Sequence, residues 1–237
     1  MFGLWIAGEG STDEAALREL LKKQMIPFEG FTDEQPAFVK GTDREDFLRK
    51  AIAAVMQGLP LPMADVAEYL STPVAAPGNV LRKYVCLQLS LLPYLRVNSR
   101  ITWLEGCFLL GGDLLIAPLG EDGRVDALLP DGVWTELSTG ECFTGRLRRI
   151  RGLNAMPVLA RENSVIPIGV DDRRTDAEDA DRVTLQWFQP GAEARCVLSE
   201  GTEYRLTHRN GAFTGESMTD KTWHLIVRQS GEERLIR

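Results

Sequence analysis

The stretch Gly111-Gly-Asp-Leu-Leu-Ile-Ala-Pro-Leu119 indicates the fold class of the second half of the chain. Its apolar run from Leu114 to Ala117 is short and ends at Pro118, which is the pattern of a buried strand followed by a turn. Turn residues and short apolar runs then alternate for the next thirty or so positions. The pattern predicts the core of a β-sandwich, with strands over residues 114–117, 125–129, 133–137 and 142–144 and a hairpin turn at 138–141.

Four segments of this region resemble the junction after the catalytic barrel in family 31 of the glycoside hydrolases, the α-glucosidase and α-xylosidase family. In that family G-D-x-L-L-x-A-P is followed by L-P-x-G-x-W, by T-G-E and by I-P-V-F-x-R-x-G-S-I-I-P. The chain carries similar segments in the same order, at Gly112–Pro118, Leu129–Trp134, Thr139–Glu141 and Met156–Pro167. The resemblance implies β-domains that serve as scaffold, and it does not by itself imply catalysis.

The composition is that of a soluble globular protein, with 237 residues, 44% hydrophobic and 26% charged. The net charge of −7 disfavours nucleic acid or an anionic membrane as a partner, and no apolar run is long enough to cross a bilayer. The N-terminus lacks the basic region of a signal peptide. We expect no metal and no cofactor, and we expect buried free thiols in a reducing, cytoplasmic compartment, since the cysteines are widely spaced at positions 86, 107, 142 and 196.

Residues 1–98 alternate short apolar runs with helical spacing, which is typical of parallel βα units. Strands are expected over residues 3–7, 26–28, 37–39 and 59–66. Helices are expected to begin at the capping box Ser11–Glu14, at Thr42 or Asp43, and at Asn79, with Gly58 ending the second helix.

The spacing changes after residue 98, from helical to short strands with turns. A charged segment at 169–181 is interpreted as a linker, and the strands after it alternate like an antiparallel sheet over 183–188, 194–199, 203–208 and 222–227. The predicted fold class is α/β plus all-β. The predicted domains are a partial, half TIM-like βα barrel over 1–98, a proximal β-sandwich over 99–170 and a distal β region over 171–237.

The half-barrel follows from a weaker resemblance of the first hundred residues to the same family. Gly3–Glu9 is similar to the family's G-F-W-x-D-x-x-E, whose aspartate is the nucleophile, and Ala37–Asp43 is similar to the W-x-G-D strand that carries the acid/base. Gly58–Val66 looks like the loop that lines the sugar subsite. Arg82–Tyr84 and Leu91–Leu95 match the family's R-K-Y and L-L-P-Y-L. The resemblance implies the second half of the catalytic barrel.

The residues at the implied catalytic positions depart from the family. Retaining glycoside hydrolysis needs two carboxyl groups about 5–5.5 Å apart. The nucleophile position carries Ala7, whose methyl group cannot form a glycosyl ester, and the acid/base position carries Thr42. Asp43 replaces Thr42 only if one residue is inserted. The family's arginine and histidine are absent from the intervals 28–40 and 69–82 where they are expected.

Two carboxylates remain at matching positions, Glu9 and Asp65, and Asp43 lies between them in sequence. On a functional interpretation the three form a residual polar pocket that binds substrate at the carboxyl ends of the strands. On a structural interpretation Glu9 is a solvated loop residue, Asp43 a helix cap and Asp65 a turn residue.

The five tryptophans are interpreted as core residues. An exposed tryptophan on the β-domains would favour carbohydrate binding.

Three functions are compatible with these patterns. The chain is a catalytically incompetent relative of family 31, or an active α-glycosidase with a rearranged or partner-completed carboxylate site, or a carbohydrate-binding β-module. We expect no hydrolysis of aryl α-glycosides.

We also expect a homodimer. Four barrel strands would leave their apolar faces, which include Leu4, Ile6 and Leu61, partly uncovered.

Overall fold

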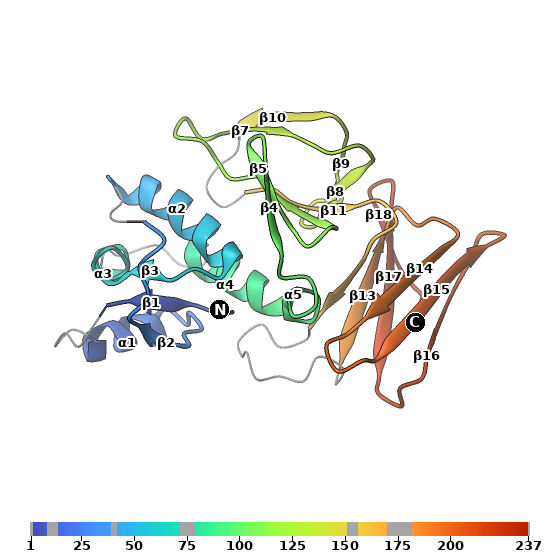
Figure 1. Cartoon of the computed structure of the whole chain (residues 1–237), viewed down its shortest axis with the longest axis horizontal. Coiled ribbons are helices and arrows are strands. Elements are labelled where there is room, and N and C mark those ends of the chain that lie inside the picture. Colours follow the sequence, from blue (N-terminus) through green and yellow to red (C-terminus); the bar gives the residue numbers. More distant parts are fainter. Residues whose placement is uncertain are drawn as a thin grey trace. The chain divides into compact units, whose positions relative to one another are not determined.

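The computed structural model describes residues 2–8, 14–38, 42–71, 79–150, 156–169 and 182–236. Figure 1 shows their helices and strands. They divide into two compact units, one holding the described residues up to Leu89 and the other those from Ser90 onward. Helices occur only before Arg96 among the described residues, and strands predominate after it. Glu9, the capping residues 11–13 and the expected linker lie outside the described residues.

The first unit contains a three-stranded parallel sheet in the order β2-β1-β3. Its strands are β1 (Trp5–Ala7), β2 (Gly30–Thr32) and β3 (Leu61–Pro62). Parallel pairing is what the alternation of strands and helices predicts. Two strand positions were wrong: the expected strand at 26–28 lies at 30–32, and Ala37 and Phe38 belong to no strand.

The helices of this unit are α1 (Glu14–Lys23), α2 (Arg44–Gln57), α3 (Met63–Ser71) and α4 (Val80–Ser90). The expected caps of α2 are confirmed: Asp43 caps its first turn, and Gly58 ends it at φ +71°. The helix after Asn79 is confirmed as α4. The expected strand over 59–66 was wrong except at Leu61–Pro62: residues 59 and 60 belong to no strand, and α3 starts at Met63.

The apolar residues of the parallel sheet are covered within the chain. Leu4, Ile6 and Leu61 are fully buried, so the expectation that they would be left partly uncovered was wrong. The guanidinium of Arg18 lies over two half-buried rings, 5.1 Å from the centroid of Phe28 and 4.9 Å from that of Phe31. Such stacking covers aromatic surface without burying the charge.

The second unit begins with the short helix α5 (Leu92–Leu95) and a six-stranded sheet in the order β4-β5-β6-β11-β8-β9. Every pair in this sheet is antiparallel, and the expected hairpin at 138–141 is confirmed as the β8–β9 turn. A separate antiparallel pair joins β7 to β10. The strands are β4 (Ile101–Leu104), β5 (Cys107–Leu110), β6 (Leu114–Ile116), β7 (Arg124–Leu128), β8 (Trp134–Glu136), β9 (Cys142–Phe143), β10 (Arg146–Ile150) and β11 (Val158–Arg161).

The last part of the chain forms two facing sheets with one shared core, which includes Trp187, Tyr204 and Leu225. The sheets are β12-β13-β17-β18 and β14-β15-β16 (Figure 1). The expected wholly antiparallel arrangement was wrong in one place: β13 pairs with β17 in parallel. The strands are β12 (Val165–Ile168), β13 (Val183–Phe188), β14 (Glu193–Val197), β15 (Glu203–Arg209), β16 (Ala212–Ser217), β17 (Trp223–Gln229) and β18 (Glu232–Leu235).

All four cysteines are free, as expected. Cys107 and Cys196 are buried, whereas Cys142 is exposed, so the expected burial holds for only part of the set. Burial raises the pKa of Cys107 to about 11, which keeps this thiol protonated at neutral pH. Among the helices of the described ranges, none has the length and apolar character needed to cross a membrane.

Candidate functional site

The implied nucleophile position lies at the end of a parallel strand. Ala7 is the last residue of β1 and stands opposite Pro62 of β3, directly before α3. The next residue, Gly8, donates its backbone N–H to the carbonyl of Thr32. A barrel enzyme places its reacting groups at this end of a strand. Here the side chain at that end is a methyl group, and Glu9, the next carboxylate along the chain, lies outside the described residues.

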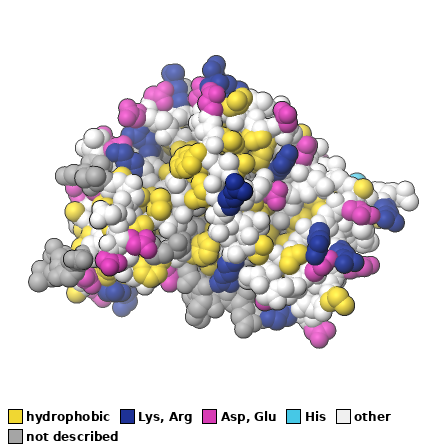
Figure 2. All heavy atoms as spheres, viewed as in Figure 1, with side chains coloured by type: hydrophobic (Ala, Val, Ile, Leu, Met, Phe, Trp, Pro, Cys, Tyr) yellow, Lys and Arg dark blue, Asp and Glu magenta, His cyan; other side chains and the backbone are white. Residues whose placement is uncertain are grey.

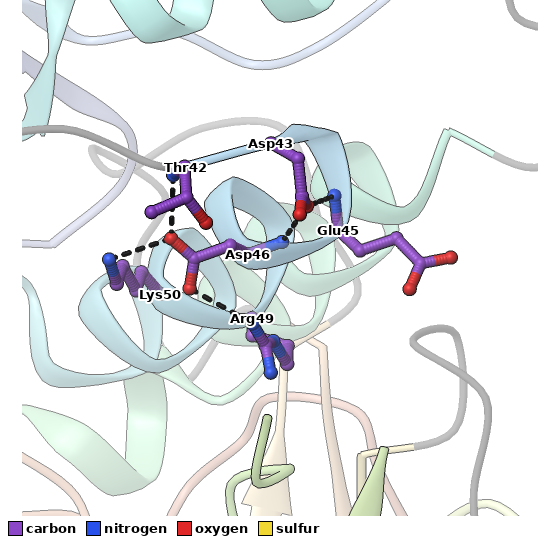
Figure 3. A network of polar contacts seen from close by, with 6 residues as sticks. All are labelled: Thr42, Asp43, Glu45, Asp46, Arg49 and Lys50. Atoms are coloured by element: carbon purple, nitrogen blue, oxygen red, sulfur yellow. Dashed lines mark hydrogen bonds and ion pairs between the residues drawn. The ribbon is translucent and has the colours of Figure 1, made fainter. Parts of the chain in front are cut away.

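Asp43 is engaged in helix capping. One of its carboxylate oxygens, Oδ1, accepts hydrogen bonds from the backbone N–H groups of Glu45 and Asp46, both at 2.9 Å. These are two of the N–H groups that the first turn of a helix leaves without a partner. The carboxylate therefore points back into the start of α2 (Figure 3).

Asp65 lies in the first turn of α3 and is buried, so its expected place in a turn was wrong. One turn further along the same face of α3 is Tyr69. The guanidinium of Arg44 lies 4.4 Å from the centroid of the Tyr69 ring, and Phe47 lies 5.3 Å from the same ring. The start of α2 therefore packs against the second half of α3 through aromatic contacts.

A carboxylate with several partners in this unit is Asp46, which no sequence pattern singled out. It is only 6% exposed, and it accepts hydrogen bonds from Lys50 at 2.7 Å, from Arg49 at 2.9 Å and from the backbone N–H of Thr42 at 2.8 Å. Figure 3 shows these groups converging on it. The hydrogen bonds from Lys50 and Thr42 lower the pKa of Asp46 from 3.8 to about 2.

The Asp46 cluster makes a pH-dependent contribution to stability. Because the folded pKa lies below the unfolded one, the contribution is complete above pH 3.8 and is lost as the pH falls toward 2. Asp46→Asn should lower the free energy of unfolding by about 2 kcal/mol at pH 7, and the difference from the unmodified protein should shrink below pH 3.8.

Urea denaturation at several pH values measures this effect. The matched control is Asp43→Asn, since asparagine caps helices as well as aspartate does. An equal loss of stability in both variants, or a loss for Asp46→Asn that does not change with pH, would contradict the assignment.

A second candidate site lies in the proximal β region of the other unit. A pocket of about 830 Å³ is lined by apolar residues, among them Trp103, Leu104, Pro118 and Leu119, and by the charged residues Asp122, Arg124, Asp126, Arg148 and Arg149. Trp103 is 64% exposed, so its interpretation as core was wrong. All five tryptophans are described, and Trp103 alone among them is exposed.

The pocket is built around the tip of the β4–β5 hairpin. Trp103 pairs with Phe108 across the hairpin, and the ring centroids lie 5.0 Å apart. At the tip, Gly106 has φ +73°, and a Cβ there would lie 1.9 Å from the carbonyl oxygen of Asp126. The backbone N–H of Leu128 donates to the carbonyl of Glu105 at 3.0 Å. The hairpin tip is therefore fixed against β7 by direct backbone contact.

The charged lining of the pocket comes largely from side chains on the exposed face of the β7–β10 pair. Asp126 stands opposite Arg148 in the register and accepts a hydrogen bond from it at 3.2 Å. Arg146 bridges Asp126 and Glu105, and hydrogen bonds from the two arginines lower the pKa of Asp126. Figure 2 shows cationic and anionic side chains side by side along the edge where Figure 1 places β7 and β10.

Comparisons with known proteins found a family model and a relative that match parts of this chain. Residues 94–166 match the model of the glycosyl hydrolase family 31 C-terminal domain. Alpha-glucosidase 2 of Bacillus thermoamyloliquefaciens is 27% identical over 110 residues, which are 45% of this chain and 14% of that protein. The chain thus spans a small part of this curated relative.

Solved structures show the same fold at low identity. A family 31 dextranase of Flavobacterium johnsoniae, complexed with glucose, has a TM-score of 0.63 at 18% identity, covering 78% of this chain and 30% of that one. A cycloalternan-forming enzyme from Listeria monocytogenes, in complex with its pentasaccharide substrate, has a TM-score of 0.67 at 14% identity, covering 94% of this chain and 26% of that one. The chain spans less than a third of either structure.

Proposed function

We infer that this chain, a glycoside hydrolase family 31-like protein, has no glycosidase activity of its own and acts by binding carbohydrate. The observation that carries the first half of this proposal is Ala7 at the end of β1, where the family resemblance expects the nucleophilic aspartate. A methyl group offers no lone pair to the sugar's anomeric carbon. The covalent step of a retaining mechanism is therefore unavailable at this position.

The acid/base position supports the same proposal. Thr42 carries a hydroxyl group whose proton is not released near neutral pH, and the carboxylate of Asp43 already accepts two backbone hydrogen bonds. The carboxylate of Asp43 is therefore engaged in capping α2 and points back into the start of that helix.

The parallel sheet of the first unit supports a relation to part of the family's βα barrel. Its order of strand and helix, from β1 through α3, is that of a βα repeat. We propose that residues 1–98 correspond to this part and residues 99–170 and 171–237 to the β-domains after it. We also propose a homodimer that forms through the edges of β2 and β3. We propose a cytoplasmic location, since a reducing compartment suits four free thiols.

The alternative is an active α-glycosidase with a rearranged or partner-completed site. It predicts turnover where our proposal predicts none. The purified protein should release no nitrophenol from nitrophenyl α-glucoside or α-xyloside above the buffer rate, because loss of a catalytic nucleophile costs roughly a million-fold in rate. The measurement is absorbance at high enzyme concentration, with light scattering of the same sample to test the homodimer.

Two variants sharpen this assay. Ala7→Asp alone should remain inactive, because it restores the nucleophile without an acid/base. Activity in the unmodified protein that disappears on Asp43→Ala would overturn the proposal and establish a rearranged site.

A further inference from the structure

We propose that the pocket beside the β4–β5 hairpin binds a neutral oligosaccharide, with the indole of Trp103 as its stacking platform. The inference rests on the proposed function for its choice of carbohydrate. The site itself rests on the pocket, on the exposure of one aromatic ring and on the charge pairing around it.

The platform is a large apolar ring held in place on the β4–β5 hairpin. Trp103 is exposed, whereas its cross-strand neighbour Phe108 is fully buried and lies at an interplanar angle of 51° to it. Phe108 therefore anchors the indole to the core, while Trp103 stays exposed and lines the pocket. Exposing a tryptophan on a rigid strand forgoes the stabilisation that burial would give, which is the expected pattern for a ligand-binding aromatic residue.

The hairpin that carries the ring has little freedom to move. Gly106 brings the turn so close to β7 that no side chain fits between them, and Cys107, next to it, is buried with its thiol 3.6 Å from the carbonyl of Leu128. A platform fixed in this way loses little conformational entropy when a ligand stacks on it.

The charges around the ring favour a neutral ligand over an ionic one. Each arginine of the pocket is already paired with a carboxylate: Arg124 with Asp122 at 3.5 Å, Arg148 with Asp126 at 3.2 Å and Arg149 with Glu141 at 2.8 Å. An anion would have to compete with these carboxylates. Sugar hydroxyls can instead accept from the remaining guanidinium N–H groups and donate to the carboxylates without disrupting the pairs.

The dimensions and lining agree with a short oligosaccharide. A volume of about 830 Å³ lies within the range of small-ligand pockets, about 300–1,000 Å³. Leu104, Pro118 and Leu119 add apolar lining to that of Trp103, and the charged side chains supply hydrogen-bonding groups. A pyranose combines the same two kinds of surface, with C–H groups on its faces and hydroxyls around its rim.

Isothermal titration calorimetry with maltotriose and isomaltotriose tests the proposal. We expect binding of at least one of the two by the unmodified chain, about tenfold weaker binding by Trp103→Ala, and a smaller loss for Trp103→Phe, which keeps an aromatic face. Met218→Ala is the matched control, since Met218 is a fully exposed apolar residue directly after β16 and its loss should leave the affinity unchanged.

Fluorescence provides a second readout that a merely structural role would not change. Trp134, Trp187 and Trp223 are buried, Trp5 is partly exposed and Trp103 is the most exposed of the five, so the bound sugar should reduce acrylamide quenching in the unmodified chain and not in Trp103→Ala. Circular dichroism confirms that each variant is folded.

Two outcomes would overturn the inference: no binding of either sugar up to about 10 mM, or equal affinity of the unmodified chain and Trp103→Ala. These outcomes differ from those that would contradict the proposed absence of glycosidase activity. Hydrolysis together with Trp103-dependent binding would contradict the absence of activity and support the binding site. Absence of both hydrolysis and binding would contradict the binding site and support the absence of activity.

Discussion

Gly106→Ala should lower the free energy of unfolding of the second unit by at least about 3 kcal/mol. Two separate effects add at this position. The backbone lies at φ +73°, where a residue with a Cβ is strained, and the Cβ itself would lie 1.9 Å from the carbonyl oxygen of Asp126. Since that neighbour is backbone and not a flexible side chain, the hairpin tip must move away from β7.

The matched control is Gly145→Ala. Gly145 has nearly the same φ, +67°, but no atom lies within 4 Å of the position its Cβ would occupy. Its substitution isolates the conformational strain and should lower the free energy of unfolding by about 1 kcal/mol. Urea denaturation of both variants gives the difference. Equal destabilisation by the two substitutions would show that the hairpin tip is not packed against β7 as described.

Trp187→Ala should destabilise the distal sandwich by about 4 kcal/mol, since a fully buried tryptophan leaves a large cavity when truncated. The ring lies 6.0 Å from that of Phe213 in the opposite sheet, so it helps to hold the two layers together. Its indole N–H also donates to the side-chain oxygen of Asn163 at 3.0 Å.

Trp187→Phe separates packing from hydrogen bonding. It keeps most of the apolar volume but leaves Asn163 with one donor fewer, and we expect a loss of about 1–2 kcal/mol. The loss in thermal or urea stability should therefore be clearly larger for alanine than for phenylalanine. Similar losses for both would mean that the hydrogen bond to Asn163 outweighs the packing.

Local patterns predicted many of the regular elements, missed some of them, and were insufficient for contacts between distant segments. The caps of α2 could be predicted because Asp43 and Gly58 act on neighbouring backbone groups. Helix α3 was missed because Pro60 and Pro62 are typical of a broken strand. A proline is equally suited to the start of a helix, where its missing N–H has no cost.

The same limit applies to the candidate sites. Trp103 alternates with its neighbours as a core residue would, and only the tertiary structure shows that nothing in the described part of the chain covers most of its ring. Asp46 stands in a run of charged residues at the start of α2, and the sequence does not indicate which of them faces Lys50 and Arg49. Departures from a family motif, such as Ala7, were visible directly because they depend on residue identity alone.

The parallel pairing of β13 with β17 has a consequence for the order of events during synthesis. Val183 pairs with Trp223, and the whole of β14, β15 and β16 lies between them in sequence. During translation β13 therefore emerges well before the strand that completes its side of the sheet, and its unpaired edge stays open to other chains meanwhile. The distal sandwich can close only after residues 223–229 have left the ribosome, which makes the arrival of β17 the step that completes this sheet.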